Sequence, residues 1–205
     1  MSLFSLASRL LAYPDEELEG AYAEAAAEAA ALPPSPAAEA LGRFLAWFAT
    51  TSGDERRRAY VTTFDFDRRT NLYLTYHLHG DRRRRGIELV RLKRRFREAG
   101  LELAEGELPD YLPVLLEFAE LAPGPGTAVL TGLRGSLELV RAALHERGSA
   151  YADLLEAIVL ALPPLTRRQA EAVHRLAAEG PPTEQVGLES FTPPELEPFL
   201  AGRDR

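Results

Sequence analysis

Cysteine is missing from the chain, which has 205 residues. Disulfide bonds, thiolate nucleophiles and the usual ligands of iron–sulfur clusters and structural zinc are therefore excluded. The absence also fits a reducing compartment. Only four histidines are present, and we predict neither a protein-bound metal nor a resident cofactor.

Long apolar runs are missing as well. No run approaches the ~20 residues that a membrane-spanning helix needs, and no cationic leader precedes an apolar core in the first residues. We therefore expect a cytoplasmic protein that does not insert into a membrane. Lysine is nearly absent, since Lys93 is the only one, and the net charge of −7 mildly favours cationic partners.

Motifs that mark common enzyme classes are absent too. The chain contains no Walker loop, no G-x-S-x-G and no glycine fingerprint of a dinucleotide site. The sequence thus predicts a binding protein and not an enzyme.

Helical periodicity is what the chain has in abundance. Leu41, Phe44, Leu45 and Phe48 follow the i, i+3, i+4, i+7 spacing of an amphipathic helix. Similar stripes, separated by proline and glycine breaks, recur to about residue 180. We predict an all-α fold, with a single globular domain of roughly nine to ten helices over residues 1–180. Residues 181–205 are rich in proline and glutamate, and we expect them to form a mobile tail.

The secondary structure of three segments needs a separate prediction. Residues 72–79 alternate like a strand, but an isolated strand in a helical chain lacks a backbone partner, so we predict a buried helix that ends at Gly80. The Ala-Pro-Gly-Pro-Gly segment of residues 122–126 predicts a break. Apolar residues with 3,4 spacing predict one continuous helix over residues 130–144.

Asp110 and Glu117 lie seven residues apart, which is about two helical turns or 10 Å. With Val114 and Leu121 they predict a mixed acidic and apolar strip on a helix surface. The strip is either an ordinary solvated face or one wall of a groove for a basic amphipathic peptide. In the second case, changing Asp110 and Glu117 together to alanine is expected to weaken peptide binding without unfolding the protein.

Tyr73, His77 and Gly80 align along one side of the predicted helix of residues 72–79. Buried hydroxyl and imidazole groups usually bond to the backbone or to carboxylates, here Asp65 or Asp110. The alternative is a ligand surface at which Gly80 permits close approach of the backbone. His77 and His79 point about 200° apart on a helix, so they cannot share a metal ion.

An arginine-rich segment follows, at the positive end of a helix dipole. It is either a solvated face paired with glutamates or a surface for an acidic protein or a phosphate-bearing group. Nucleic acid is disfavoured, because the net charge opposes it and aromatic residues are not interleaved. The candidate residues for an anionic partner are Arg82, Arg83, Arg84, Arg85, Arg91, Arg94 and Arg95.

Three blocks in this region resemble the NarJ-type chaperones, a family of redox-enzyme maturation factors. They are YVTTFD at residues 60–65, LYLTYHLHGD at residues 72–81 and ELPDYLPVLLEF at residues 107–118. The resemblance implies a chaperone that binds the N-terminal segment of the apo nitrate reductase catalytic (alpha) subunit. It would hold that subunit competent for insertion of the molybdenum cofactor and iron–sulfur clusters before membrane assembly.

The resemblance also implies a binding region and partners. The expected client is a basic amphipathic peptide, and molybdenum cofactor delivery proteins are further partners. Tyr111 stands where related chaperones have a histidine in an Asp-His pair. The residues carried over by matching blocks are Tyr60, Phe64, Asp65, Tyr73, Tyr76, His77, Gly80, Asp81, Leu108, Pro109, Asp110, Tyr111 and Glu117. The rival hypothesis is a helical protein that binds phosphate or nucleic acid through residues 82–97.

Overall fold

A computed structural model describes residues 2–80, 83–167, 170–171 and 175. The first five helices are α1 (Leu3–Leu10), α2 (Glu16–Ala30), α3 (Pro36–Thr50), α4 (Gly53–Phe64) and α5 (Leu74–His79). The next five are α6 (Arg83–Glu98), α7 (Leu112–Leu121), α8 (Pro123–Gly132), α9 (Arg134–Glu146) and α10 (Tyr151–Ala161). These ten helices, found in the described part of the chain, confirm the all-α prediction.

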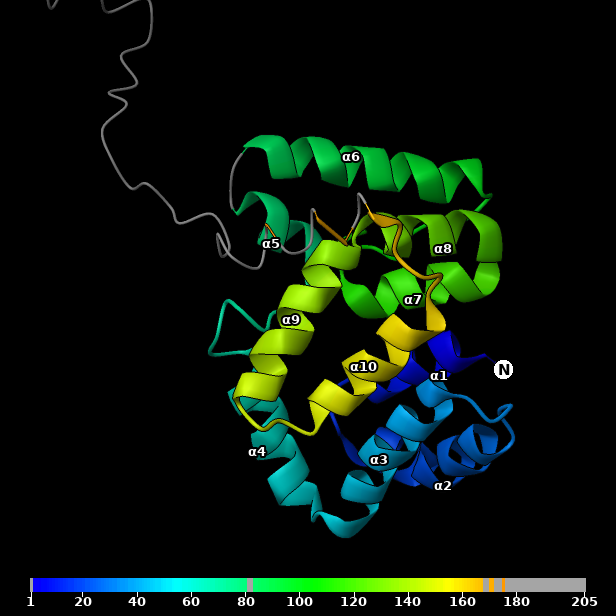
Figure 1. Cartoon of the computed structure of the whole chain (residues 1–205), viewed down its shortest axis with the longest axis vertical. Coiled ribbons are helices and arrows are strands. Elements are labelled where there is room, and N and C mark those ends of the chain that lie inside the picture. Colours follow the sequence, from blue (N-terminus) through cyan, green and yellow to red (C-terminus); the bar gives the residue numbers. More distant parts are fainter. Residues whose placement is uncertain (1, 81–82, 168–169, 172–174, 176–205) are drawn as a thin grey trace, which may run out of the picture.

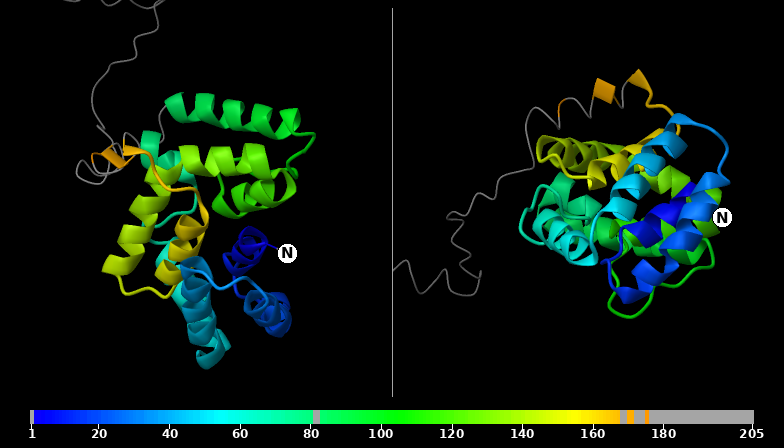
Figure 2. Two further views of the ribbon diagram at one scale, coloured as in Figure 1. Left: turned by 45° about the vertical axis from the view of Figure 1, so that its right-hand side comes forward. Right: turned by 90° about the horizontal axis from the view of Figure 1, so that it is seen from below.

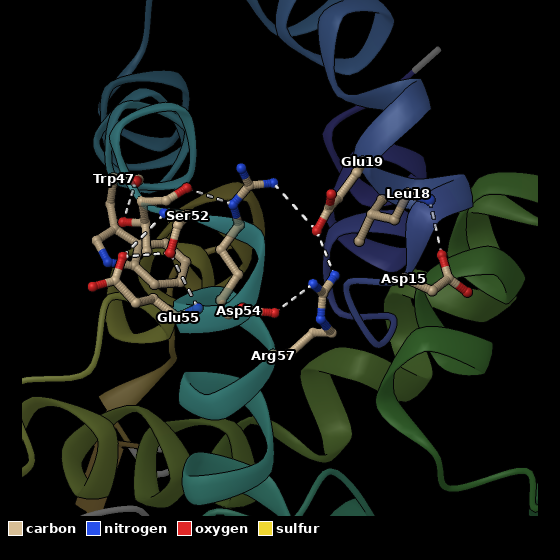
Figure 3. A network of polar contacts seen from close by, with 10 residues as sticks. Asp15, Leu18, Glu19, Trp47, Ser52, Asp54, Glu55 and Arg57 are labelled. Carbon is tan, nitrogen blue, oxygen red and sulfur yellow. Dashed lines mark hydrogen bonds and ion pairs between the residues drawn. The ribbon is translucent and has the colours of Figure 1, made fainter.

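Side-chain caps explain the starts of α1 to α4. Asp15 accepts a hydrogen bond from the Leu18 amide at 2.9 Å and so caps α2. Ser52 and Glu55 form a reciprocal capping box at α4. The side chain of Arg57 then lies 2.8 Å from both Asp54 and Glu19, which ties α4 to α2 (Figure 3).

One continuous apolar core joins the helices. The most extensive contacts are those of α10 with α3, of α7 with α8 and of α1 with α7. Tyr151, at the start of α10, has its ring centroid 5.2 Å from that of Phe44 and 4.9 Å from that of Phe64. Trp47 packs on the rim of this aromatic cluster, with its ring centroid 5.7 Å from that of Tyr151.

Five of the helices mark the two ends of the molecule. α5 and α6 lie at one end, and α2, α3 and α4 lie at the other, in both Figure 1 and the left view of Figure 2. α6 is the outermost element, and only Leu92 and Phe96 of its residues are buried. Among the described residues, no helix combines the length and the apolar character that crossing a membrane requires.

The break predicted at residues 122–126 is confirmed but is limited to Ala122, between the end of α7 at Leu121 and the start of α8. Pro123 starts α8, and the Pro-Gly-Pro-Gly sequence forms its first turn. Proline is tolerated there because the first-turn amides have no partner within the helix. Gly126 is required for packing, since a Cβ atom at this position would lie 2.4 Å from the Cα atom of Ala119 in α7.

The single helix predicted over residues 130–144 is wrong. The chain bends at Leu133, whose amide closes α8 with hydrogen bonds of 3.0 Å to Val129 and 3.2 Å to Leu130. Gly132 weakens helix propensity at this point. Arg134 then begins α9 in a buried position, with Nε 3.2 Å from Glu138 and Nη1 3.4 Å from the Pro163 carbonyl oxygen.

The helix predicted for residues 72–79 is confirmed from Leu74 onward, and Gly80 ends it with a φ of 57°. Leu72 lies in a bend and Tyr73 is extended, which corrects the prediction for those two residues. The tail predicted for residues 181–205 lies outside the described residues.

Candidate functional site

A two-residue antiparallel bridge joins Tyr73 to Tyr111 and organises the candidate site. The Leu74 amide donates to the Asp110 carbonyl oxygen at 2.9 Å, and the Leu112 amide donates to the Leu72 carbonyl oxygen at 2.8 Å. The rings of Tyr73 and Tyr111 lie side by side with centroids 5.2 Å apart. The bridge thus places two sequence blocks, at residues 72–81 and 107–118, in direct contact.

Asp110 lies beneath the bridge and has no exposed surface. Its Oδ2 atom accepts a hydrogen bond of 2.5 Å from the Thr75 hydroxyl and lies 3.3 Å from Nη2 of Arg85. Its Oδ1 atom is buried without a hydrogen-bond partner among the described residues. The carboxylate therefore holds α5, α6 and the turn before α7 together.

Arg85 extends this cluster toward the surface. Its guanidinium carbon lies 5.8 Å from the ring centre of Tyr73 and 6.0 Å from that of Tyr76. These are cation–π distances. The Arg85 side chain is only 18% exposed, so this residue belongs to the buried cluster and not to the exposed basic patch in which the sequence placed it.

Four residues around the bridge present an acidic and aromatic surface. Tyr73 and the carboxylates of Asp65 and Glu107 are exposed, and Tyr111 is half-buried. Burial raises the pKa of Tyr111, and the negative charges of Asp65 and Glu107 raise it further. We call Asp65, Tyr73, Glu107 and Tyr111 the tyrosine surface.

Tyr60 and Phe64 support this surface from the core. The Tyr60 hydroxyl donates to the Leu11 carbonyl oxygen at 3.2 Å, and its ring packs 4.9 Å from that of Phe64. Burial raises the pKa of Tyr60 strongly, so its hydroxyl stays protonated. Both residues are at most 9% exposed, which makes them structural supports.

His77 is also structural. Its imidazole is 1% exposed and its Nε2 atom lies 2.9 Å from the Asn71 carbonyl oxygen. Burial lowers the pKa of His77, so the neutral ring donates its Nε2 proton to that carbonyl. No group of three or more histidine, aspartate or glutamate side chains in the described residues could hold a metal ion.

The acidic strip predicted on α7 does not exist in the expected form. α7 begins at Leu112, so Asp110 lies in the preceding turn and points into the protein. Val114 is buried as well, and only Glu117 and Leu121 are exposed. Glu117 faces α1, where its Oε1 atom lies 3.1 Å from the Ser8 hydroxyl.

Leu108 and Pro109 lie at the edge of the tyrosine surface. Pro109 is buried, whereas Leu108 is partly exposed and lines a cavity of about 630 Å³. Glu107, Glu105 and Glu102 also line it, opposite Phe96 and Arg97 of α6. Lys93 also lines this cavity, so its acidic side faces two basic residues of α6.

The remaining predicted residues fall into two groups. Gly80 closes α5, while Asp81 and Arg82 lie outside the described residues. Arg83, Arg84, Arg91, Arg94 and Arg95 are exposed along α6. Arg91 and Arg95 line a second cavity, of about 490 Å³, between α5, α6 and α8.

Sequence reasoning missed Thr75 and Glu107. Thr75 bonds to Asp110 across 35 residues, and no local pattern marks such a pair. Glu107 stood in one of the quoted sequence blocks, next to Leu108 and Pro109, and its charge was the available signal.

Comparison with known proteins identifies the family of this chain. A model of the nitrate reductase delta subunit family matches residues 30–157. The chain belongs to this family. The match contains all three blocks, at residues 60–65, 72–81 and 107–118, and so confirms the resemblance to NarJ-type chaperones.

Relatives within the delta subunit family cover the chain to different extents. The probable nitrate reductase molybdenum cofactor assembly chaperone NarJ of Bacillus subtilis is 37% identical over 160 residues, which are 78% of this chain and 87% of that protein. The nitrate reductase molybdenum cofactor assembly chaperone NarJ of Escherichia coli K12 is 38% identical over 160 residues, or 75% of this chain and 66% of that protein. The nitrate reductase-like protein NarX of Mycobacterium tuberculosis H37Rv is 36% identical over 157 residues, which are 24% of its length.

Proposed function

We propose that this delta subunit family member is a system-specific chaperone of nitrate reductase. It binds the N-terminal segment of the apo catalytic (alpha) subunit in the cytoplasm. It holds that subunit competent for insertion of the molybdenum cofactor and iron–sulfur clusters before membrane assembly, and it catalyses no reaction itself. The names of the relatives NarJ from Bacillus subtilis and Escherichia coli support the coarser part of this proposal.

The tyrosine surface supports the peptide-binding part. Exposed tyrosine rings offer apolar contact area at a low entropy cost. The carboxylates of Asp65 and Glu107 beside them would pair with the basic side chains of an amphipathic peptide and orient it. The observation that carries the proposal is the Tyr73–Tyr111 pair, with ring centroids 5.2 Å apart, together with the exposed carboxylates of Asp65 and Glu107.

The predicted site residues then divide into two roles. Asp65, Tyr73, Leu108 and Tyr111, together with Glu107, would contact the client peptide. The buried residues Tyr60, Phe64, His77, Pro109 and Asp110, together with Tyr76 and Gly80, would hold that surface in shape. Glu117 lies against α1 and would contribute least.

Calorimetric titration of the purified protein tests this proposal. The titrant is a synthetic peptide that copies the N-terminus of the nitrate reductase catalytic subunit of the same organism. We expect saturable one-to-one binding that a scrambled peptide does not reproduce. No heat at a peptide concentration of about 0.1 mM, which corresponds to binding weaker than about −5.5 kcal/mol, would show that this segment is not a sufficient client.

Paired variants locate the binding surface. Asp65→Asn with Glu107→Gln removes two charges from the tyrosine surface and should lower the affinity on the order of tenfold, with a weaker dependence on salt. Glu17→Gln with Glu39→Gln removes two charges from exposed positions on α2 and α3 and is the matched control. Equal affinities of the two double variants for the peptide would show that the client binds to a surface other than the tyrosine surface.

A second candidate function is binding of an anionic partner through α6. The exposed arginines at positions 83, 84, 91, 94 and 95 favour it. Retention on heparin with a steep salt dependence would support this function, because neutralising phosphates or sulfates releases counterions.

A further inference from the structure

α6 is strongly basic in an otherwise acidic chain. Residues 83–98 contain eight lysines and arginines and two glutamates, a charge of +6. The whole chain has a net charge of −7, so the other residues together carry −13. Such a helix creates a local positive field on an acidic protein, and that field attracts an acidic segment.

One side of α6 borders a groove. The cavity of about 490 Å³ is lined by Glu88, Arg91, Leu92 and Arg95 from α6, by Thr75, Leu78 and His79 from α5, and by Ala128, Val129, Gly132 and Leu133 from α8 and its end. Glu88 pairs with Arg91 at 2.5 Å, so the α6 wall keeps a net charge of +1. α8 has no charged residue, so the opposite wall is neutral and largely apolar. A segment with glutamates on one side and large apolar residues on the other fits such a groove.

We propose that residues 181–200 of the same chain dock into this groove. These twenty residues lie outside the described part of the chain, and they contain four glutamates and no lysine or arginine. Their leucines and phenylalanines are Leu188, Phe191, Leu196, Phe199 and Leu200. The glutamates complement Arg91 and Arg95, and the apolar side chains complement Val129 and Leu133.

The connecting chain is long enough to reach any side of the domain. Phe191 follows Arg175, the last described residue, by sixteen positions. At about 3.3 Å per residue these positions span about 50 Å, more than the diameter of about 40 Å expected for a domain of this size. Tethering also gives an effective concentration on the order of 1 mM, so a weak contact suffices.

Docking would leave the tyrosine surface free, so the inference does not depend on the proposed client. It would cover Arg91 and Arg95 and thereby shield α6 from other anions. The acidic segment would act as an internal competitor for any negatively charged partner of the groove.

The test uses the full chain, in which Ala201→Cys supplies the only thiol. A nitroxide on that cysteine broadens the NMR signals of nearby methyl groups. We expect strong broadening at Val129, Leu133 and Leu92, and its loss in about 1 M salt, where the screening length is about 3 Å. Uniform or absent broadening at low salt would overturn the proposal.

Charge reversals on the two sides of α6 make the test specific. Arg91→Glu with Arg95→Glu reverses the groove side and should abolish the broadening. Arg83→Glu with Arg94→Glu makes the same change on exposed residues that do not line the cavity and should leave the broadening in place. Equal loss in both variants would mean a diffuse attraction and no docking in the groove.

Mixing distinguishes the segment of the same chain from that of a second copy. Protein that carries the nitroxide but no isotope enrichment is mixed with isotope-enriched protein that carries no nitroxide. Broadening in this mixture would assign the segment to a neighbouring molecule and contradict docking within one chain. Docking also predicts that heparin displaces the segment, and unchanged broadening with heparin bound to α6 would count against the groove.

Discussion

The Thr75 hydroxyl donates a hydrogen bond of 2.5 Å to Oδ2 of Asp110, which lies 35 residues away in the sequence. The same oxygen lies 3.3 Å from Arg85, and Asp110 has no exposed surface. The contact joins α5 and α6 to the turn that precedes α7. It turns an acidic residue expected on the surface into an internal support for the Tyr73–Tyr111 bridge.

Replacing Asp110 should therefore cost stability. In Asp110→Ala the partly buried Arg85 loses its partner, and the free energy of unfolding should fall by about 3 kcal/mol. Urea unfolding followed by the fluorescence of Trp47, the one tryptophan, measures this change. Glu117→Ala is the control, with an expected change within about 0.5 kcal/mol, because Glu117 is exposed.

This result would also correct an expectation from the sequence. The double change of Asp110 and Glu117 to alanine cannot serve as a neutral probe of binding, because one of its two sites is buried. Equal stabilities of the two single variants would contradict the role assigned to the buried cluster.

Gly126 and Gly124 make a matched pair within the first turn of α8. A Cβ atom at residue 126 would lie 2.4 Å from the Ala119 Cα atom, whereas nothing lies within 4 Å of one at residue 124. Gly126→Ala should force α7 and α8 apart and lower the free energy of unfolding by about 1–3 kcal/mol. Gly124→Ala should raise it by about 0.4–1 kcal/mol by restricting the unfolded chain. Thermal unfolding of both variants is the measurement, and a stabilised Gly126→Ala would contradict the close contact.

His77 should make stability depend on pH. Burial lowers its pKa in the folded protein, so the unfolded chain binds more protons between that lowered pKa and the ordinary value of about 6.5. Stability is therefore complete above about pH 6.5 and falls as the pH drops toward the folded-state pKa. The measurement is the free energy of unfolding in urea at several pH values.

Two histidine variants isolate this effect. His77→Gln should flatten the fall in stability below about pH 6.5, because no imidazole remains to be protonated on unfolding. His145→Gln changes an exposed histidine and should leave the slope as it is. A slope that survives in His77→Gln would assign the pH dependence to other groups.

Tyr73 should matter more for binding than for folding. Its side chain is 38% exposed, so Tyr73→Ala should lower the free energy of unfolding by no more than about 1.5 kcal/mol. The affinity for the client peptide should fall about tenfold, as for a central aromatic contact. Leu121→Ala, on the strip that the sequence suggested, is 68% exposed and is the control for calorimetry. A greater loss of affinity in Leu121→Ala than in Tyr73→Ala would indicate that the client binds on α7.

Short-range signals predicted much of the fold. Ser2, Asp15 and Ser52 cap α1, α2 and α4, because a cap needs only residues within one turn. Gly100, with a φ of 76°, follows the end of α6 at Glu98. Leu112, Leu115, Leu116 and Ala119 are buried together, since helical spacing alone places these side chains on one face.

The candidate site was harder to predict, because its contacts join distant segments. A helical wheel placed Asp110 on the surface, yet α7 starts two residues later and the bridge to Tyr73 turns its side chain inward. The rule that an isolated strand has no partner also failed here, because the segment before α7 supplies one. Arg85 was expected in an exposed patch but lies in the buried cluster, because its partner Asp110 comes from a distant segment.

The sequence by itself determined the helical class, most helix boundaries and the family, because these depend on spacing and caps within a few residues and on three blocks in order. The tertiary structure decided which polar residues are supports and which form a surface. Burying a carboxylate requires partners, and the partners of Asp110 lie 35 and 25 residues away. Only the packing of α5 and α6 against the turn before α7 brings them together and leaves Tyr73 exposed.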